Sequence, residues 1–193
     1  VDLEAEFDIP PERTTIIVVA NARRMKGMDY LGTAIGRLPA DLGLHFLFVG
    51  RGLETNKLGS DLSDSYYGHQ FTFTGFRKDV LNIIAAADVS LLPSVKGEGL
   101  SKVLLESMFL ARPTIMTDID GNKGLGIGGE TALIVPARDD EALTEAMLNI
   151  AEKPALREKL GTAGKAYITE HFQANRTVAD LDVAYRTVLS RNN

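Results

Sequence analysis

The sequence predicts an α/β fold, a doubly wound parallel sheet of the Rossmann-like class. Short apolar runs rich in Val, Ile, Leu and Phe alternate with longer segments whose apolar residues recur at helical spacing. Crossovers between parallel strands are right-handed, so this alternation places helices on both faces of one sheet. The chain has 193 residues, enough for about one domain, and 45% of them are apolar, which is ordinary for a globular core.

The predicted strands are short and buried. The first, at residues 14–20, is the run TTIIVVA, which is typical of a parallel strand covered on both faces. The third, QFTFT, ends at Gly75, because glycine commonly marks the point where a strand becomes a loop. After the first strand, the predicted strands lie at 45–50, 70–74, 89–93, 113–117 and 132–135.

The predicted helices follow the strands. The first, at 26–38, has apolar residues at helical spacing and stops before Pro39. A weak helix is expected at 56–65. The remaining predicted helices lie at 78–86, 101–110, 139–151, 154–169 and 173–191.

Composition excludes several classes of function. The 21 basic and 26 acidic residues give a net charge of −5, which argues against a nucleic-acid partner. Because the chain has no cysteine, disulfides, thiolate metal sites and cysteine nucleophiles are excluded. The three histidines are too widely spread to suggest a metal cage. No apolar run reaches the roughly 18 residues expected of a membrane-spanning helix.

Ligands bind beyond the carboxyl ends of the strands in such sheets, so the loops after the strands form the candidate site. The first of these loops contains Arg23, Arg24 and Lys26 and leads into a helix. Cations beside a helix N-terminus suit a diphosphate, although a solvated basic turn has the same pattern.

The second loop contains Gly50 and Gly52 on either side of Arg51. These glycines could let the backbone approach a ligand closely, or they could form a plain tight turn. Thr55 stands where the dinucleotide fingerprint G-x-G-x-x-G requires its third glycine. The sequence therefore disfavours a nicotinamide oxidoreductase.

Two later segments add candidate contacts. Phe76, beside Arg77, follows the third strand and could pack on a nucleobase or be an ordinary buried loop aromatic. Ser101 is a good candidate for the N-cap of the next helix. Glu106 lies among apolar residues of that helix, so its carboxylate needs a hydrogen-bond donor, either a ribose diol or a structural Arg.

Asp118 and Asp120 form an Asp-x-Asp pair after the fifth strand. Such a pair can hold a divalent metal against a diphosphate. The Gly-Asn-Lys-Gly that follows favours a simple turn instead, and we expect no metal site.

The stretch 98–106 (EGLSKVLLE) resembles the E-x7-E motif of retaining glycosyltransferases with the GT-B architecture, in the large glycosyl transferases group 1 family. Further motifs occur in the family's order, and the resemblance covers roughly residues 14–170. These motifs are the basic loop at 23–27, the segments 73–75 (FTG) and 87–94 (ADVSLLPS), and 113–115 (PTI). The sequence departs from the family pattern at Leu100, at Ala111 and in the loop after Thr117.

The resemblance implies roles for the matching residues. The catalytic contacts would be Glu98, on the hydroxyls of the donor sugar, and Arg23 (or Arg24) with Lys26, on the diphosphate leaving group. Glu106 would hold the ribose hydroxyls. The expected nucleotide-binding residues are Arg24, Gly50, Gly52, Phe76, Arg77, Gly99, Leu100, Ser101 and Glu106.

The resemblance also implies that the chain is the C-terminal, donor-binding half of a two-domain enzyme. Residues 1–13 would be a linker or edge segment, 14–171 the donor domain, and 172–193 a helix that crosses back onto an acceptor domain. The donor would be a nucleotide-diphospho-sugar, in the first place a UDP-sugar, with GDP- and ADP-sugars as alternatives. No metal or other cofactor is expected.

The expected acceptor is a saccharide or glycolipid, in polysaccharide, lipopolysaccharide or glycolipid synthesis. The enzyme would be cytoplasmic, or peripheral at the inner face of the membrane. The chain alone is expected to be inactive, and an apolar stripe in 173–191 could make it a dimer. Two other functions fit the same residues: a non-catalytic nucleotide-binding module, and a sugar-nucleotide hydrolase or epimerase of related fold.

Overall fold

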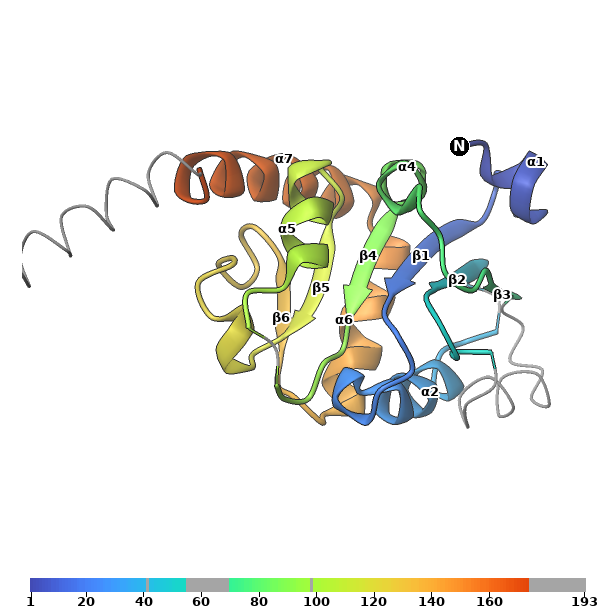
Figure 1. Cartoon of the computed structure of the whole chain (residues 1–193), viewed down its shortest axis with the longest axis horizontal. Coiled ribbons are helices and arrows are strands. Elements are labelled where there is room, and N and C mark those ends of the chain that lie inside the picture. Colours follow the sequence, from blue (N-terminus) through green and yellow to red (C-terminus); the bar gives the residue numbers. More distant parts are fainter. Residues whose placement is uncertain (41, 55–69, 98, 174–193) are drawn as a thin grey trace, which may run out of the picture.

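The computed structural model describes residues 1–40, 42–54, 70–97 and 99–173. Its centre is a six-stranded sheet in the order β3-β2-β1-β4-β5-β6, with every neighbouring pair parallel (Figure 1). The predicted doubly wound α/β fold is confirmed. The strands are β1 Thr14–Val19, β2 Leu44–Val49, β3 Gln70–Phe73, β4 Val89–Leu92, β5 Thr114–Thr117 and β6 Leu133–Val135.

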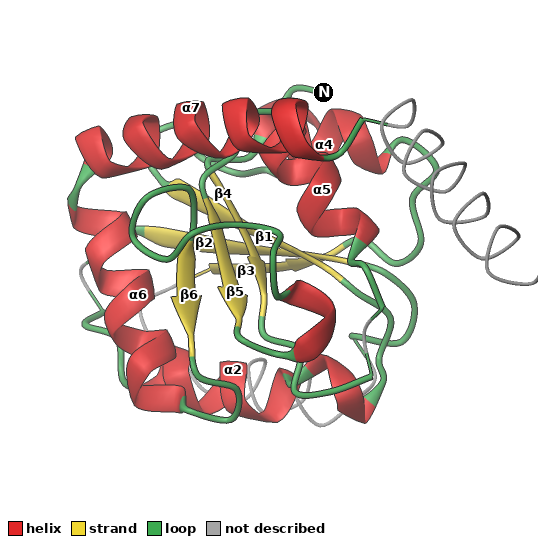
Figure 2. Ribbon diagram, turned by 90° about the vertical axis from the view of Figure 1, so that its left-hand side faces the viewer, coloured by secondary structure: helices red, strands yellow, loops and turns green. Residues whose placement is uncertain are grey.

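Helices cover both faces of this sheet. The helix α2 packs against α6 on one side, while α5 packs against α4 and α7 on the other, and Figure 2 shows the sheet between these layers. Asp139 caps α6 by accepting a hydrogen bond from the Ala142 N–H at 2.9 Å, and Pro154 opens α7. The α-helices are α1 Leu3–Phe7, α2 Met28–Gly36, α4 Val80–Ala86, α5 Lys102–Phe109, α6 Asp140–Glu152 and α7 Pro154–His171.

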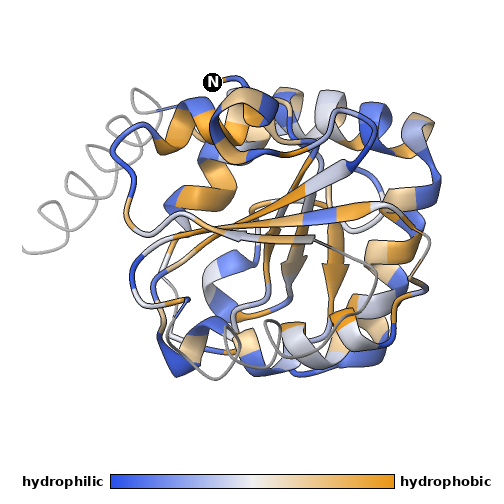
Figure 3. Cartoon of the chain, turned by 90° about the vertical axis from the view of Figure 1, so that its right-hand side faces the viewer, coloured by the Kyte–Doolittle hydropathy of each residue, from blue (hydrophilic) through white to orange (hydrophobic). Residues whose placement is uncertain are grey.

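The core has two clusters, and successive side chains of β1 and β2 enter different ones because they point to opposite faces of the sheet. Ile16 and Val18 of β1 pack in the larger cluster, with residues of α2 and α6. Ile17 lies between them on the chain and packs in a second cluster with Ile83 and Ile84 of α4. Figure 3 shows hydrophobic colouring along much of the central sheet.

The segment 1–13, expected to be a linker or edge piece, carries the helix α1. Asp2 caps this helix by accepting from the backbone N–H groups of Glu4 and Ala5, both at 3.1 Å. Leu3 and Phe7 pack against the second cluster. Leu3, Phe7 and Ile9 thus attach this segment to the same core as the sheet.

The predicted helix at 26–38 begins later than expected. Arg24–Lys26 is a short 3-10 turn, and α2 starts at Met28. Between them Gly27 has φ +69°, a left-handed conformation that interrupts the helix.

Three sequence predictions fall outside the described residues: the weak helix at 56–65, nearly all of the helix at 173–191, and the position of Glu98. Within the described ranges, no helix is long and apolar enough to cross a membrane.

Candidate functional site

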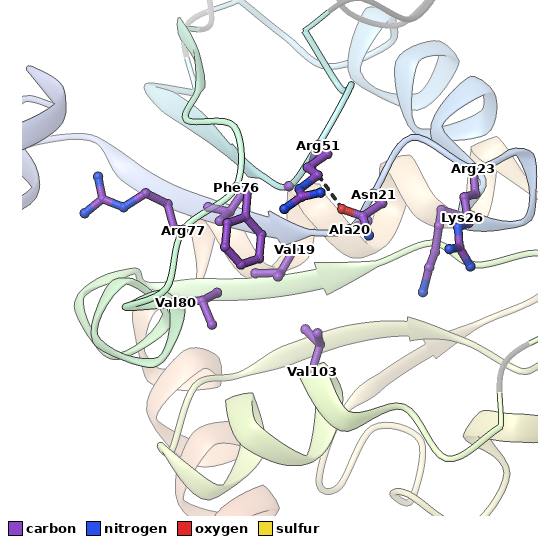
Figure 4. A pocket seen from close by; sticks show the side chains of 12 residues that line it. Val19, Ala20, Asn21, Arg23, Lys26, Arg51, Phe76, Arg77, Val80 and Val103 are labelled. Atoms are coloured by element: carbon purple, nitrogen blue, oxygen red, sulfur yellow. Dashed lines mark hydrogen bonds between the residues drawn. The ribbon is translucent and has the colours of Figure 1, made fainter.

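A cavity of about 470 Å³ lies at the carboxyl ends of β1 and β2 and beside the first turn of α5. The sheet order reverses here, since β1 leads outward to β2 and β3 on one side and borders β4 on the other. Crevices at such a switch point are the ligand sites of open parallel sheets. Val19 and Val103 contribute apolar wall, and polar side chains stand at either end (Figure 4).

One end of the cavity is basic. Arg23 and Lys26 both line it and lie near each other in Figure 4. Their loop is held by the loop after β4, because the Val95 N–H donates to the Met25 carbonyl at 2.8 Å. Two cations on a braced loop suit a phosphate or diphosphate. Arg24, which the sequence also suggested, is exposed in the 3-10 turn and does not line the cavity.

The other end of the cavity is aromatic. The side chain of Phe76 is 57% exposed, so the interpretation as a buried loop aromatic is wrong. The guanidinium of Arg51 lies 4.8 Å from the centroid of the Phe76 ring. Val80 adds apolar surface beside them. An exposed ring next to an apolar wall suits a planar group such as a nucleobase.

The two ends are joined by contacts between the loops after β1 and β2. The backbone N–H of Arg51 donates to Asn21 Oδ1 at 3.0 Å, and the Ala22 N–H donates to the Arg51 carbonyl at 2.9 Å. Gly50 makes the approach possible, since a Cβ there would lie 1.7 Å from the Ala20 carbonyl oxygen. Gly52 is a turn residue with φ +74° and does not line the cavity.

The side chain of Arg77, one of the expected ligand contacts, is engaged by carboxylates outside the cavity. Although the residue lines the cavity, its guanidinium points away from it in Figure 4. It donates to both carboxylate oxygens of Asp79, at 2.8 and 2.7 Å, and also to Glu6. These hydrogen bonds hold the pKa of Asp79 below its usual range and raise that of Arg77.

Two residues at the start of α5 and within it, Ser101 and Glu106, differ from expectation. Ser101 occupies the N-cap position of α5, but its side chain caps no backbone N–H and is 5% exposed. Glu106 finds its donor on its own helix, where Lys102 Nζ lies 3.2 Å from the carboxylate, rather than in a structural Arg. Gly99 and the exposed Leu100 do not line the cavity, and Glu98 is outside the described residues.

The Asp-x-Asp pair forms a turn. Asp118 Oδ1 accepts from the Ala137 N–H at 2.9 Å, and Asp120 pairs with Lys123 at 2.6 Å in the 3-10 turn Asp120–Asn122. This pairing lowers the pKa of Asp120 and raises that of Lys123. In the part of the chain that the structure describes, no cluster of three or more His, Asp or Glu residues could hold a metal ion.

Two residues of this site, Asn21 and Arg51, were not predicted from the sequence. Arg51 stands between the two glycines of the second loop, and Asn21 is the second residue after β1. Their positions in loops after strands were the signals that could have indicated them. Their contact with each other could not be predicted, because it joins residues 30 apart in the chain.

Comparison with known proteins identifies the class. Residues 13–153 match the family model "Glycosyl transferases group 1", and the chain belongs to this family. Its fold matches half of a GT-B glycosyltransferase structure: it superposes with TM-score 0.82 and 17% identity on Anabaena Alr3699/HepE in complex with UDP-glucose, covering 94% of this chain and 51% of that one.

Two relatives show what kind of enzyme this chain is similar to. N-acetyl-alpha-D-glucosaminyl L-malate synthase of Bacillus anthracis is 23% identical over 97% of this chain and 49% of its own length. The lipopolysaccharide core biosynthesis glycosyltransferase LpsE of Rhizobium meliloti is 27% identical over 87% of this chain and 48% of its own. The chain thus spans about half the length of these relatives.

Proposed function

We propose that this chain is the C-terminal, donor-binding half of a retaining glycosyltransferase that transfers a sugar from a nucleotide-diphospho-sugar to a saccharide or glycolipid. The observation that carries the proposal is the cavity at the switch point, with two cations at one end and an exposed aromatic ring at the other, in a member of this family. The names of the relatives support synthesis of lipopolysaccharide or a related glycan.

The chemistry of the site begins with the leaving group. As the bond from the sugar to the diphosphate breaks, negative charge develops on the diphosphate, and fixed cations stabilise that charge. Arg23 and Lys26 would bind the diphosphate, with no metal required. The nucleoside would then extend along Val19 and Val103 toward Phe76.

The two glutamates of the E-x7-E motif would hold the hydroxyl groups of the donor. Glu106, whose side chain is 21% exposed and paired with Lys102, would accept from the ribose diol. Glu98 would orient the donor sugar. The acceptor would be held by a domain outside this chain, so we expect the chain alone to bind the donor and transfer little or no sugar.

The donor nucleotide is proposed to be UDP, with GDP and ADP as alternatives. The Anabaena protein on which this chain superposes was solved in complex with UDP-glucose, which supports placing UDP before GDP and ADP. Self-association through residues 173–191 and a location at the inner face of the membrane also remain proposals, which sedimentation and vesicle binding of the chain would test.

The binding proposal is tested by titration calorimetry with UDP, using Arg23→Gln and Arg24→Gln as a matched pair. Losing a hydrogen bond to a charged group costs about 1.5–3 kcal/mol, so Arg23→Gln should weaken UDP binding about 10- to 100-fold. Arg24→Gln removes the same charge one residue away, outside the cavity, and should stay within about twofold. Equal losses in both variants would contradict the assignment of Arg23 to the diphosphate.

A further inference from the structure

The side chain of Arg77 joins the loop between β3 and α4 to the helix α1. It lies in the loop between β3 and α4, immediately after Phe76. Its guanidinium forms a bidentate pair with Asp79, whose Oδ2 is 2.7 Å from Nη2, and the same nitrogen donates to Glu6 of α1. The Arg77 side chain is 26% exposed, and those of Glu6 and Asp79 are 37% and 36% exposed. The network is therefore partly shielded from water.

The helix α1 is anchored beneath this network. The guanidinium of Arg77 lies 5.3 Å from the centroid of the Phe7 ring, and Phe7 packs with Leu3 on the second core cluster. Val19 and Val80 pack on that same cluster and also line the cavity. The helix and the aromatic end of the cavity thus share one apolar support as well as the ionic contact.

We propose that Glu6 and Asp79 are positioning residues: acting through Arg77, they hold the loop 75–77, so that α1 shapes the nucleoside end of the cavity. This inference rests on the proposed function, because it assigns the aromatic end to a nucleoside. None of these three side chains needs to touch the ligand.

The physical reason is the exposure of Phe76. A ring that is 57% exposed has little packing of its own, so its direction depends on the adjoining backbone. A bidentate arginine–carboxylate pair restricts that backbone more than a single ion pair does. If the loop 75–77 and the Phe76 ring are already ordered in the free protein, less conformational entropy is lost when a ligand binds. Asp79 is ionised at neutral pH, and its hydrogen bonds with Arg77 lower its pKa further.

The competing interpretation is an ordinary surface ion pair, which would add slightly to stability and nothing to the site. The two interpretations differ in which ligands are affected. A positioning network at the aromatic end should affect a ligand with a base and ribose. It should not affect inorganic pyrophosphate, which would occupy only the basic end with Arg23 and Lys26.

The experiment compares Glu6→Gln with Glu4→Gln in the full chain of 193 residues. Glu4 is an exposed carboxylate on the same helix, and among the described residues it forms no hydrogen bond or ion pair with Arg77. Both variants therefore remove one charge from α1, but only Glu6→Gln removes the contact with Arg77. Calorimetry measures Kd for UDP and for pyrophosphate. Glu6→Gln should raise Kd for UDP about three- to fivefold, the upper range for partly exposed ion pairs, and leave Kd for pyrophosphate unchanged.

Asp79→Asn breaks the network from the α4 side and should act in the same direction. Equal Kd values for UDP in Glu6→Gln and Glu4→Gln would overturn this inference and leave the proposed function standing. So would an equal loss of affinity for UDP and for pyrophosphate in Glu6→Gln. A wild-type chain that binds none of UDP, GDP or ADP would overturn the proposed function.

Hydrogen exchange of the free protein tests the positioning without any ligand. The backbone amides at 75–79 should exchange faster in Glu6→Gln than in Glu4→Gln, because the loop loses its tie to α1. Unchanged exchange there would contradict the positioning role, whatever the binding data show.

Discussion

Gly50 determines how closely two loops of the site can meet. Its φ is +145°, and its N–H donates to the Gly75 carbonyl at 2.8 Å. In Gly50→Ala the new Cβ would lie 1.7 Å from the backbone oxygen of Ala20, so backbone atoms must move. We expect the free energy of unfolding in urea to fall by at least about 3 kcal/mol.

Gly43→Ala is the matched control. Gly43 has φ +61° but open space around it, so this variant should lose only the cost of a left-handed residue, about 1–2 kcal/mol. Similar losses in both variants would mean that the loops can separate freely at Gly50.

The residues of the site could be predicted only in part. Arg23, Lys26 and Phe76 lie in loops that follow strands, so the fold class placed them at the carboxyl edge of the sheet, where the structure has them. Arg77 was predicted by the same rule, yet its side chain turns to Glu6, 71 residues away. Asp79, the other partner of Arg77, is only two residues away, but the contact with the distant carboxylate of Glu6 cannot be predicted from neighbouring residues.

At the scale of elements, α7 depends on two glycines that face its neighbours. A Cβ at Gly161 would lie 2.3 Å from the Ala111 carbonyl oxygen, and one at Gly164 would lie 2.8 Å from that of Thr131. These contacts let α7 pack closely on the rest of the domain. Ala111 itself has φ +57°, so the turn after α5 is shaped for this approach.

The variant Gly161→Ala therefore shows which effect is larger, the steric clash of a new Cβ or the higher helix propensity of alanine. Propensity alone would stabilise the helix by about 1 kcal/mol, but the clash with backbone should outweigh it and lower the melting temperature. Thr162→Ala, at the exposed neighbouring position, should raise the melting temperature slightly. A more stable Gly161→Ala would show that α7 can shift without cost.

Element boundaries were less predictable than element types. The first helix was expected from residue 26, but Gly27 interrupts it, since its φ of +69° suits the contact with the loop after β4. Ser101 stands at the N-cap of α5 without bonding to it. At Gly27 a close approach to the Pro93 carbonyl oxygen, in the loop after β4, overrides the local preference for helix.

For the whole molecule, ligand binding should stabilise the fold by mass action. At a UDP concentration 100-fold above Kd, the gain is about 2.7 kcal/mol, or roughly 5–10 °C in melting temperature for a domain of this size. The shift should persist in EDTA, because Arg23 and Lys26 supply the positive charge. A shift that requires Mg²⁺ and disappears in Asp118→Ala would instead place a metal at the Asp-x-Asp turn.

The sequence by itself determined the fold class and the edge of the sheet where ligands bind. Both follow from the alternation of short apolar runs with helical spacing, which depends only on near neighbours in the chain. The tertiary structure decided which side chains at that edge face the cavity. It turned Arg77 toward Glu6, brought Asn21 to Arg51, and left Phe76 exposed. These outcomes depend on strand register and on competing partners far apart in the sequence, which no local pattern specifies.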